Sequence, residues 1–324
     1  MLRRIALVAS AALVVAYAPP PVSAQSADWS RVDLGTLGGS ISQAHVINDR
    51  GQVVGHSMTA TGQRHAFLWG DGVMTDLGTL PGSTNSNATG INNRGQVVGG
   101  PYFVANSPQA FLWQDGEMTD LGSLGGSFSM AYGINNRGQV VGGSTTAAET
   151  LHAFLWQDGV MVDLGTLGGT YSQAYGINDR GQVVGYATTS TGQLHAFLWQ
   201  HRAMTDLGAL GGSYGLATGI NNSGQVVGYS ITGTGETHAF LWEDGAMRDL
   251  GTLGGPSSAA FGINARGQVV GYATTATLQT HAFLWQDGEM TDLGGGWGAA
   301  NGINNRGQIV GRNDSLGHAV MWTR

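Results

Sequence analysis

A unit of about 43 residues recurs seven times along this chain of 324 residues. Each unit carries Ile-Asn-x-x-Gly-Gln-Val-Val-Gly, then His-Ala-Phe-Leu-Trp, then Asp-Leu-Gly, with small departures in some copies. The Ile-Asn pairs begin at Ile47, Ile91, Ile134, Ile177, Ile220, Ile263 and Ile303, in steps of 44, 43, 43, 43, 43 and 40 residues. A period of this size with several short strands per unit is typical of a propeller or another repeat array.

One unit, residues 174–207, shows why we expect four strands. Ala174 to Asn178 is a short extended segment, and the turn that follows ends at Gly181, which is free to take a positive φ. Residues 182–186 are rich in β-branched side chains, residues 195–199 alternate between two faces, and residues 204–207 form the last strand. Most copies join strands three and four through Asp-Gly, a strong hairpin signal. Four meandering strands with two apolar faces predict a propeller blade.

The two ends of the repeat array complement each other. The segment from Asp28 to Gly35 matches the end of an internal unit, and the chain closes on the first three strands of a unit. A closed ring needs each end to supply what the other lacks, whereas a solenoid needs polar caps. We therefore predict an all-β, seven-bladed β-propeller of four-stranded blades, whose ring is closed by the N-terminal strand completing the C-terminal blade. An open β-solenoid is the alternative.

The first residues resemble a secretory signal peptide. Arg3 and Arg4 precede an apolar stretch from Ile5 to Ala18, and Val22-Ser23-Ala24 resembles a cleavage site. The stretch is shorter than the roughly 20 residues a bilayer requires. We predict a signal peptide over residues 1–24, a single propeller domain over residues 25–324, and a secreted or periplasmic protein that makes no membrane contact after cleavage.

Composition excludes several kinds of chemistry. The sequence contains no cysteine and no lysine, so thiolate nucleophiles, Cys-based zinc sites and Schiff bases are ruled out. The net charge is -7 and no basic run interrupts the repeat, so nucleic acid is a poor partner. We expect no cofactor, no metal site and no catalytic residue set.

The repeated motif resembles the HAF-repeat family of predicted bacterial extracellular proteins. His-Ala-Phe is followed by Leu-Trp and by Asp-Leu-Gly, and the resemblance covers about residues 31–324. The second copy has Gln109 for the histidine, and the seventh has Val320 for the phenylalanine. Intact His-Ala-Phe begins at His65, His152, His195, His238 and His281. The resemblance implies a secreted bacterial repeat protein and implies no activity and no site residue.

Aromatic side chains concentrate at two positions on the face whose loops vary between copies. These positions lie six and two residues before each Ile-Asn pair, close to the predicted mouth of a central channel. Variable loops on a rigid scaffold commonly carry function, and exposed aromatic rings stack on sugar rings or grip a peptide. The competing interpretation is that the rings pack the connections between blades. The candidate ligand-binding residues are Phe128, Tyr132, Tyr171, Tyr175, Tyr214, Phe261 and Trp297.

The opposite face repeats the same two turns and carries a ring of arginines. We favour exposed salt bridges with the Asp-Gly aspartates, each of small energetic value, and keep anion binding by several arginines as the alternative. The repeated histidines are expected to make structural hydrogen bonds. The arginines are Arg50, Arg94, Arg137, Arg180, Arg266 and Arg306.

The sequence thus predicts a binding or scaffold module rather than an enzyme, with extracellular carbohydrate, peptide or protein as the partner. Two alternatives stay open. One is a structural protein that associates with itself and takes no small ligand. The other is a lyase or glycoside hydrolase on a propeller scaffold, which would draw on Glu149, Glu236 or His45, because few acidic residues and histidines lie outside the repeat pattern.

Overall fold

The described part of the chain folds as β-sheet joined by turns and loops. The computed structural model describes residues 29–101, 109–294, 298–313 and 317–324. These residues form 28 strands and no helix, so none of them provides a helix long and apolar enough to span a membrane. The predicted signal peptide lies outside the described residues.

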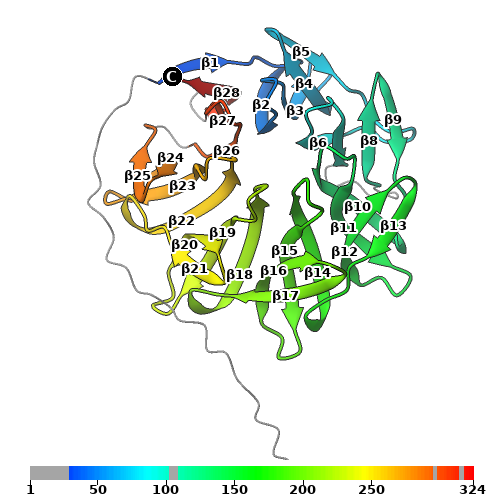
Figure 1. Cartoon of the computed structure of the whole chain (residues 1–324). Coiled ribbons are helices and arrows are strands. Elements are labelled where there is room, and N and C mark those ends of the chain that lie inside the picture. Colours follow the sequence, from blue (N-terminus) through cyan, green and yellow to red (C-terminus); the bar gives the residue numbers. More distant parts are fainter. Residues whose placement is uncertain (1–28, 102–108, 295–297, 314–316) are drawn as a thin grey trace, which may run out of the picture.

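Consecutive strands meander into four-stranded antiparallel sheets that stand around a common centre (Figure 1). The first three sheets contain β2 (Gly38–Ile47), β3 (Val53–Thr59), β4 (Arg64–Gly70) and β5 (Val73–Asp76); β6 (Asn87–Ile91), β7 (Val97–Gly100), β8 (Phe111–Gln114) and β9 (Glu117–Asp120); and β10 (Gly125–Ile134), β11 (Val140–Thr146), β12 (Leu151–Gln157) and β13 (Val160–Asp163).

The next three sheets follow the same plan, and single parallel bridges between Leu194 and Tyr214 and between Thr237 and Ser257 link them. They contain β14 (Gly168–Ile177), β15 (Val183–Thr189), β16 (Leu194–Gln200) and β17 (Ala203–Gly208); β18 (Gly211–Ile220), β19 (Val226–Thr232), β20 (Thr237–Glu243) and β21 (Ala246–Asp249); and β22 (Gly254–Ile263), β23 (Val269–Thr275), β24 (Thr280–Gln286) and β25 (Glu289–Asp292).

The last sheet joins the two ends of the chain. Its order is β1-β28-β27-β26, built from β26 (Ala300–Ile303), β27 (Ile309–Asn313), β28 (His318–Thr323) and β1 (Ser30–Asp33). β1 runs antiparallel to β28 from Ser30 opposite Thr323 to Asp33 opposite Val320 (Figure 1). The Leu34 amide then donates to the Ala319 carbonyl at 2.9 Å. The first segment of the described chain therefore supplies the outer strand of the last sheet.

The tight turns form where glycine and aspartate predict them. Asp71 and Gly72 both take positive φ, 51° and 82°, which matches the twist of a two-residue hairpin. His201 and Arg202 replace Asp-Gly in one sheet and adopt the same conformation at 51° and 62°. Side chains other than glycine rarely adopt such angles, so the surrounding hairpin enforces the turn in that copy.

The innermost strands are longer than the sequence suggested. Five of them run for ten residues from a Gly-Gly pair to the Ile of Ile-Asn, and each pairs with its neighbour through two register shifts. The variable segments that follow the fourth strands therefore end as strand. Bulges of this kind bend a strand and redirect its side chains, and here they lie next to the candidate site.

The core lies between adjacent sheets and is filled mainly by phenylalanine. The phenylalanines of the third strands are 0–1% exposed, and they pack with valines of their own repeat and of the preceding one, as Phe197 does with Val183 and Val141. The tryptophans two residues further along the third strands are less buried than the phenylalanines. Only Trp285 and Trp322, each 7% exposed, are buried, and the other five strand-three tryptophans are half-buried. A similar cluster joins Leu34 and Ile47 to Val310 and Met321, across the first and last sheets.

Candidate functional site

A pore on the common axis is divided by the seven isoleucines of the Ile-Asn pairs. They line a cavity of about 230 Å³ at one end and a cavity of about 180 Å³ at the other. The first cavity belongs to the face of the Asn-x-Arg-Gly turns. The second belongs to the face with the variable loops. The isoleucines separate two ends with different chemistry.

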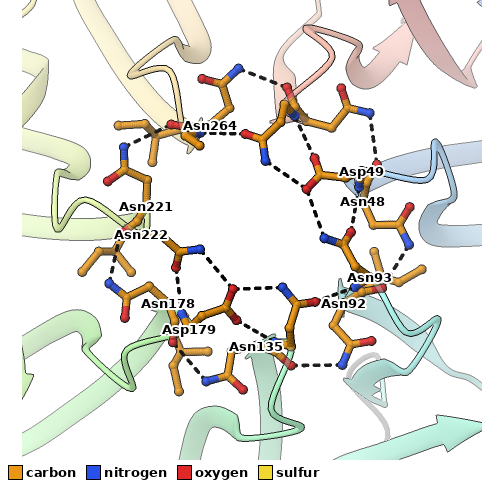
Figure 2. A pocket seen from close by; sticks show the side chains of 18 of the residues that line it. Asn48, Asp49, Asn92, Asn93, Asn135, Asn178, Asp179, Asn221, Asn222 and Asn264 are labelled. Carbon is orange, nitrogen blue, oxygen red and sulfur yellow. Dashed lines mark hydrogen bonds between the residues drawn. The ribbon is translucent and has the colours of Figure 1, made fainter.

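Seven asparagines form a hydrogen-bonded ring at the first end, which we call the asparagine collar (Figure 2). Each side-chain nitrogen donates to the backbone carbonyl of the equivalent asparagine in the next sheet, at 3.0–3.1 Å, and Asn304 returns to the carbonyl of Asn48. The collar consists of Asn48, Asn92, Asn135, Asn178, Asn221, Asn264 and Asn304.

Every polar atom of a collar side chain has a partner. Asn178 is 4% exposed. Its nitrogen also donates to Gln182 Oε1 at 2.7 Å, and its oxygen accepts from the amides of Arg180 and Gln182 at 3.0 Å. Buried amides that use all their hydrogen-bonding capacity are structural, since no group is left for a ligand. The collar holds neighbouring sheets together.

Two aspartates lie in an outer layer of the collar, one residue after the asparagines. Asp179 Oδ1 accepts from the Asn136 amide at 2.8 Å, and its Oδ2 accepts from the side chains of Asn136 and Asn222 at 3.0 Å. Burial would raise the pKa of Asp179, but these hydrogen bonds and the charge of Arg137 hold it below its ordinary value. Asp49 is bonded in the same way by Asn93 and Asn305. Both carboxylates thus already accept several N–H donors.

The other end of the pore is lined by uncharged side chains. Tyr132, Tyr175 and Phe261 stand beside Thr89 and Asn301 above the isoleucines, and in the described part of the chain no acidic or basic residue lines this cavity. A ligand that entered it would meet aromatic faces, aliphatic carbon and a few neutral polar groups.

A chain of aromatic contacts continues from this cavity across neighbouring sheets. Tyr132 and Tyr175 have ring centroids 4.8 Å apart, Tyr175 lies 5.9 Å from Tyr186, and Tyr171 stacks on Tyr186 at 5.8 Å with 19° between the planes. Separate pairs form in the two sheets that follow. We call this set the aromatic mouth: Tyr132, Tyr171, Tyr175, Tyr186, Tyr214, Tyr229, Phe261 and Tyr272.

All eight rings of the aromatic mouth are half-buried. Burial is the largest cause that raises the pKa of Tyr132, Tyr175, Tyr186 and Tyr229, so these phenols stay protonated and can donate hydrogen bonds. The Tyr186 hydroxyl already donates to Gln173 Oε1 at 2.7 Å. The rings thus pack partly on one another and keep part of their surface in solvent.

The structure brings five of the seven predicted residues into this set and leaves two outside it. Tyr132, Tyr175 and Phe261 line the cavity, Tyr171 joins them through Tyr186, and Tyr214 pairs with Tyr229 at 6.1 Å. Phe128 is half-buried at the start of its strand and contacts no other ring among the described residues. Trp297 lies outside the described residues.

Sequence reasoning missed Tyr186, Tyr229 and Tyr272, which directly follow Gln-Val-Val-Gly in three copies. The sequence did mark this position, because it varies between copies: the other four have His56, Gly100, Gly143 and Arg312 where these three have tyrosine. At Gly143 a Cβ atom would come within 3.2 Å of the Gln173 side chain, so a larger residue there requires Gln173 of the next sheet to shift.

A polar side completes the rim of the pore. Thr89 and Asn301 each donate to a backbone carbonyl of the next sheet, at 2.7 and 2.8 Å, and His45 contacts the Ala88 carbonyl at 2.8 Å. His56 lies beside His45, with ring centroids 5.1 Å apart. Burial, with the charges of His45, Arg64 and Arg312, lowers the pKa of His56 to about 3. Both histidines are thus neutral near pH 7, because burial also lowers the pKa of His45.

The repeated histidines make the structural hydrogen bonds that we expected. Each Nδ1 lies 2.7–3.0 Å from the aspartate of Asp-Leu-Gly in the same sheet, and His318 pairs with Asp33 across β28 and β1. The same aspartates accept from the amide of a glycine two residues on, as Asp76 does from Gly78 at 2.8 Å. These dyads fasten the third strand to the fourth.

The predicted salt bridges of the arginine ring are not formed. Within the described parts of the chain, none of these six guanidinium groups lies within 4.0 Å of a carboxylate. Arg94 instead extends over the next turn, where its Nη2 lies 2.7 Å from the place a Cβ of Gly138 would occupy. Because the Arg94 side chain lies over Gly138 of the next sheet, its guanidinium points away from the aspartates of the Asp-Gly turns.

The residues considered for catalysis do not form a catalytic arrangement. Glu149 Oε2 accepts from the Ser127 hydroxyl at 2.9 Å, Glu236 contacts Thr234 and His238, and His45 is engaged with the Ala88 carbonyl. Each glutamate thus contacts side chains of its own sheet. Over the described residues, no three His, Asp or Glu side chains gather in a way that could hold a metal ion.

Comparison with solved structures places the chain among β-propellers. It is similar to the β-propeller domain of the Trilobed protease from Pyrococcus furiosus, at 14% identity and a TM-score of 0.57, over 78% of this chain and 81% of that one. It is also similar to YCF48 bound to D1 peptide, at 13% identity and a TM-score of 0.53, over 94% and 98% of the two chains.

A third similar structure is the acylaminoacyl peptidase of Pyrococcus horikoshii, at 14% identity and a TM-score of 0.52, over 78% of this chain. The chain spans only 45% of that peptidase. No protein-family model matches the chain, and a search of curated proteins finds no relative. At these identities the likeness shows the fold, a β-propeller, and nothing further.

Proposed function

We propose that the chain is an exported, seven-bladed β-propeller, closed by its N-terminal strand, that binds a carbohydrate or a peptide at the aromatic mouth. The single observation that carries the binding proposal is an uncharged axial cavity bordered by half-buried tyrosines. Partly exposed aromatic rings that gather at a cavity are typical of recognition sites.

Three contacts support closure of the ring. β1 pairs with β28, the apolar cluster around Leu34 and Phe67 includes Met321, and the Asn304 side chain donates to the carbonyl of Asn48. Each of these contacts joins one end of the chain to the other. They hold the first and last sheets together, and β1 covers the edge that β28 would otherwise expose.

The location of the site rests on the difference between the two faces. The collar repeats in all seven copies and leaves its asparagines no free hydrogen-bonding group, whereas the side chains of the mouth vary between copies. A rigid scaffold with one variable face is the arrangement in which loops acquire binding functions. Export and membership of the HAF-repeat family belong to the same proposal and rest on the sequence.

A glycan and peptide array probed with the purified protein tests the binding proposal. The test variant is Tyr171→Ala/Tyr214→Ala, and the control is Arg94→Gln/Arg137→Gln on the opposite face. We expect a specific signal that the tyrosine variant loses while its circular dichroism spectrum is unchanged, and that the control keeps. Absence of any signal, or equal loss in both variants, contradicts a site at the mouth.

Two alternatives have their own tests. A structural protein without a small ligand would give no array signal and would show a mass that rises with concentration in light scattering. A lyase or hydrolase would lose turnover when Glu149, Glu236 and His45 are replaced together. The separate surroundings of the two glutamates favour neither a paired-carboxylate mechanism nor a metal-assisted one.

Deletion of residues 25–35 tests closure of the ring. The shortened chain would lose the strand opposite β28 and the buried Leu34, which is 4% exposed. We expect loss of cooperative unfolding in urea, because the last sheet would expose both an edge and its core. A chain that unfolds cooperatively at nearly the original midpoint would favour an open array instead.

A further inference from the structure

A cavity of about 320 Å³ lies outside the collar, between the β22–β25 sheet and the sheet that β1 completes. Its lining is rich in hydrogen-bond donors and includes three arginines, and among the described residues no aspartate or glutamate lines it. We call it the junction pocket. The residues on which the argument depends are Trp29, Arg266, Leu284, Arg306, Gln308 and Arg324.

The junction pocket exists because the repeat is broken where the two ends of the chain meet. In the preceding sheet, the turn between the third and fourth strands is Asp287-Gly288. In the last sheet the third strand comes from one end of the chain and the fourth from the other, with Ser30 opposite Thr323. Arg324 therefore stands where the other copies have the turn aspartate, and Trp29 stands where they have the glycine.

The same break interrupts a relay of side-chain amides. In the preceding sheet, Gln268 Nε2 donates to Gln286 Oε1 at 2.6 Å, and Gln286 Nε2 donates to Asp287 Oδ2 at 2.8 Å. Thr323 and Arg324 occupy the last two places at the junction, and the one acceptor for Gln308 Nε2 among the described residues is the sulfur of Met321, at 3.8 Å. An acidic acceptor has been replaced by a cation, and an amide donor has only a weak acceptor.

Trp29 adds a second donor in a fixed position. Its ring packs against the apolar cluster that contains Leu284, and its buried Nε1 has no hydrogen-bond acceptor among the described residues. The guanidinium of Arg324 lies 4.7 Å from the centroid of its ring. A buried N–H without an acceptor costs free energy, which an incoming acceptor would recover.

From these contacts we propose that the junction pocket binds a tetrahedral oxyanion, a sulfate or phosphate group. The guanidinium groups of Arg266, Arg306 and Arg324 supply planar, doubly donating contacts that match such oxygens. Trp29 Nε1 and Gln308 Nε2 supply neutral donors. The other arginines of the ring lack this combination, since their sheets keep the Asp-Gly turn or its His-Arg counterpart.

Isothermal titration with sodium sulfate and with sodium phosphate, at ionic strength held constant with chloride, tests the proposal. Arg306→Gln is the test variant, and Arg137→Gln is the matched control at the equivalent position of another sheet. We expect the purified protein to bind, Arg306→Gln to weaken binding by about tenfold or more, and Arg137→Gln to change it less than about twofold. Trp29→Phe, which keeps the ring and removes the N–H, is expected to weaken binding several-fold without a change in the unfolding midpoint.

A sulfated hexasaccharide derived from heparin distinguishes the source of the oxyanion. Tighter binding than inorganic sulfate by more than about tenfold identifies the group as part of a glycan, whereas similar binding identifies a free ion. No heat from any of the three probes overturns the proposal. Equal weakening by Arg306→Gln and Arg137→Gln also overturns it, because the anion would then bind the arginine ring as a whole.

Discussion

At one end of the axial pore every sheet contributes the same asparagine, whereas at the other end the side chains differ from sheet to sheet. The collar asparagines are buried and use all their donors and acceptors. The aromatic mouth is half-buried, uncharged at its cavity, and confined to part of the ring. Both ends are built by the same inner strands and separated only by the isoleucines.

The comparison shows how a repeat can separate stability from recognition. An asparagine that recurs in every copy and donates a hydrogen bond to the next copy stabilises each contact between neighbouring sheets in the same way. A side chain that appears in only some copies makes the surface asymmetric, and such a surface can match a ligand that lacks sevenfold symmetry. The junction pocket follows the same logic, because Trp29 and Arg324 occur only where the repeat is interrupted.

The largest effect is expected from the collar. Asn178→Ala removes two donated and two accepted hydrogen bonds and leaves the Asn221 carbonyl and Gln182 without their partner. We expect a loss of about 3 kcal/mol in the free energy of unfolding, measured in urea. Asn222→Ala, in the exposed outer layer, is the control and should cost less than about 1 kcal/mol. Equal costs would remove the distinction between the two layers.

Acid should destabilise the mouth through His56. Its pKa is about 3 in the folded protein and 6.5 when unfolded, so the unfolded chain binds more protons between these values and stability falls as pH decreases below 6.5. His56 is 6% exposed, and we expect a loss of about 2 kcal/mol between pH 7 and pH 5.

The variant for this prediction is His56→Tyr, since tyrosine stands at the equivalent position in three other sheets. Urea unfolding at several pH values should show a flatter dependence between pH 7 and pH 5 than the parent chain. The pKa of His238 is raised by its hydrogen bond to Asp249, and this has the opposite effect on stability. The free energy that the charged pair contributes is present at low pH and is lost as pH rises. An unchanged slope in the variant contradicts the role of His56.

The smallest effect is a gain in stability from repairing the outer layer of the collar. In the other sheets the backbone amide at the Asp49 position donates to a side-chain oxygen of the next sheet, as Asn136 does to Asp179 at 2.8 Å. Ala265 offers no such oxygen to Asn222. Ala265→Asn should stabilise the fold by about 0.5–1 kcal/mol in urea, and Ala265→Leu, which adds no acceptor, should not. A gain in stability in both variants would contradict this explanation, because leucine adds apolar contacts but no hydrogen-bond acceptor.

Much of this fold can be predicted from the sequence because the repeat shows it seven times. Asp71-Gly72 marks a hairpin, and the match of residues 28–35 to the end of a unit anticipates the pairing of β1 with β28. The collar could not be predicted, since the recurrence of Asn178 says that it matters but not that it bonds to the next sheet. Tyr186 was missed for a related reason: its contacts with Tyr171 and Tyr175 depend on the bulged inner strand.

The central claim is that the asparagine collar stabilises the fold while the aromatic mouth binds the ligand. The most direct test uses two variants of one sheet, Asn178→Ala and Tyr171→Ala. For each, the free energy of unfolding in urea and the affinity for the glycan or peptide that gives the strongest array signal are measured together. We predict that Asn178→Ala loses about 3 kcal/mol of stability and keeps its affinity, whereas Tyr171→Ala loses about 1 kcal/mol and its affinity falls at least tenfold. Parallel losses of stability and affinity in both variants would contradict the separation of the two ends of the pore.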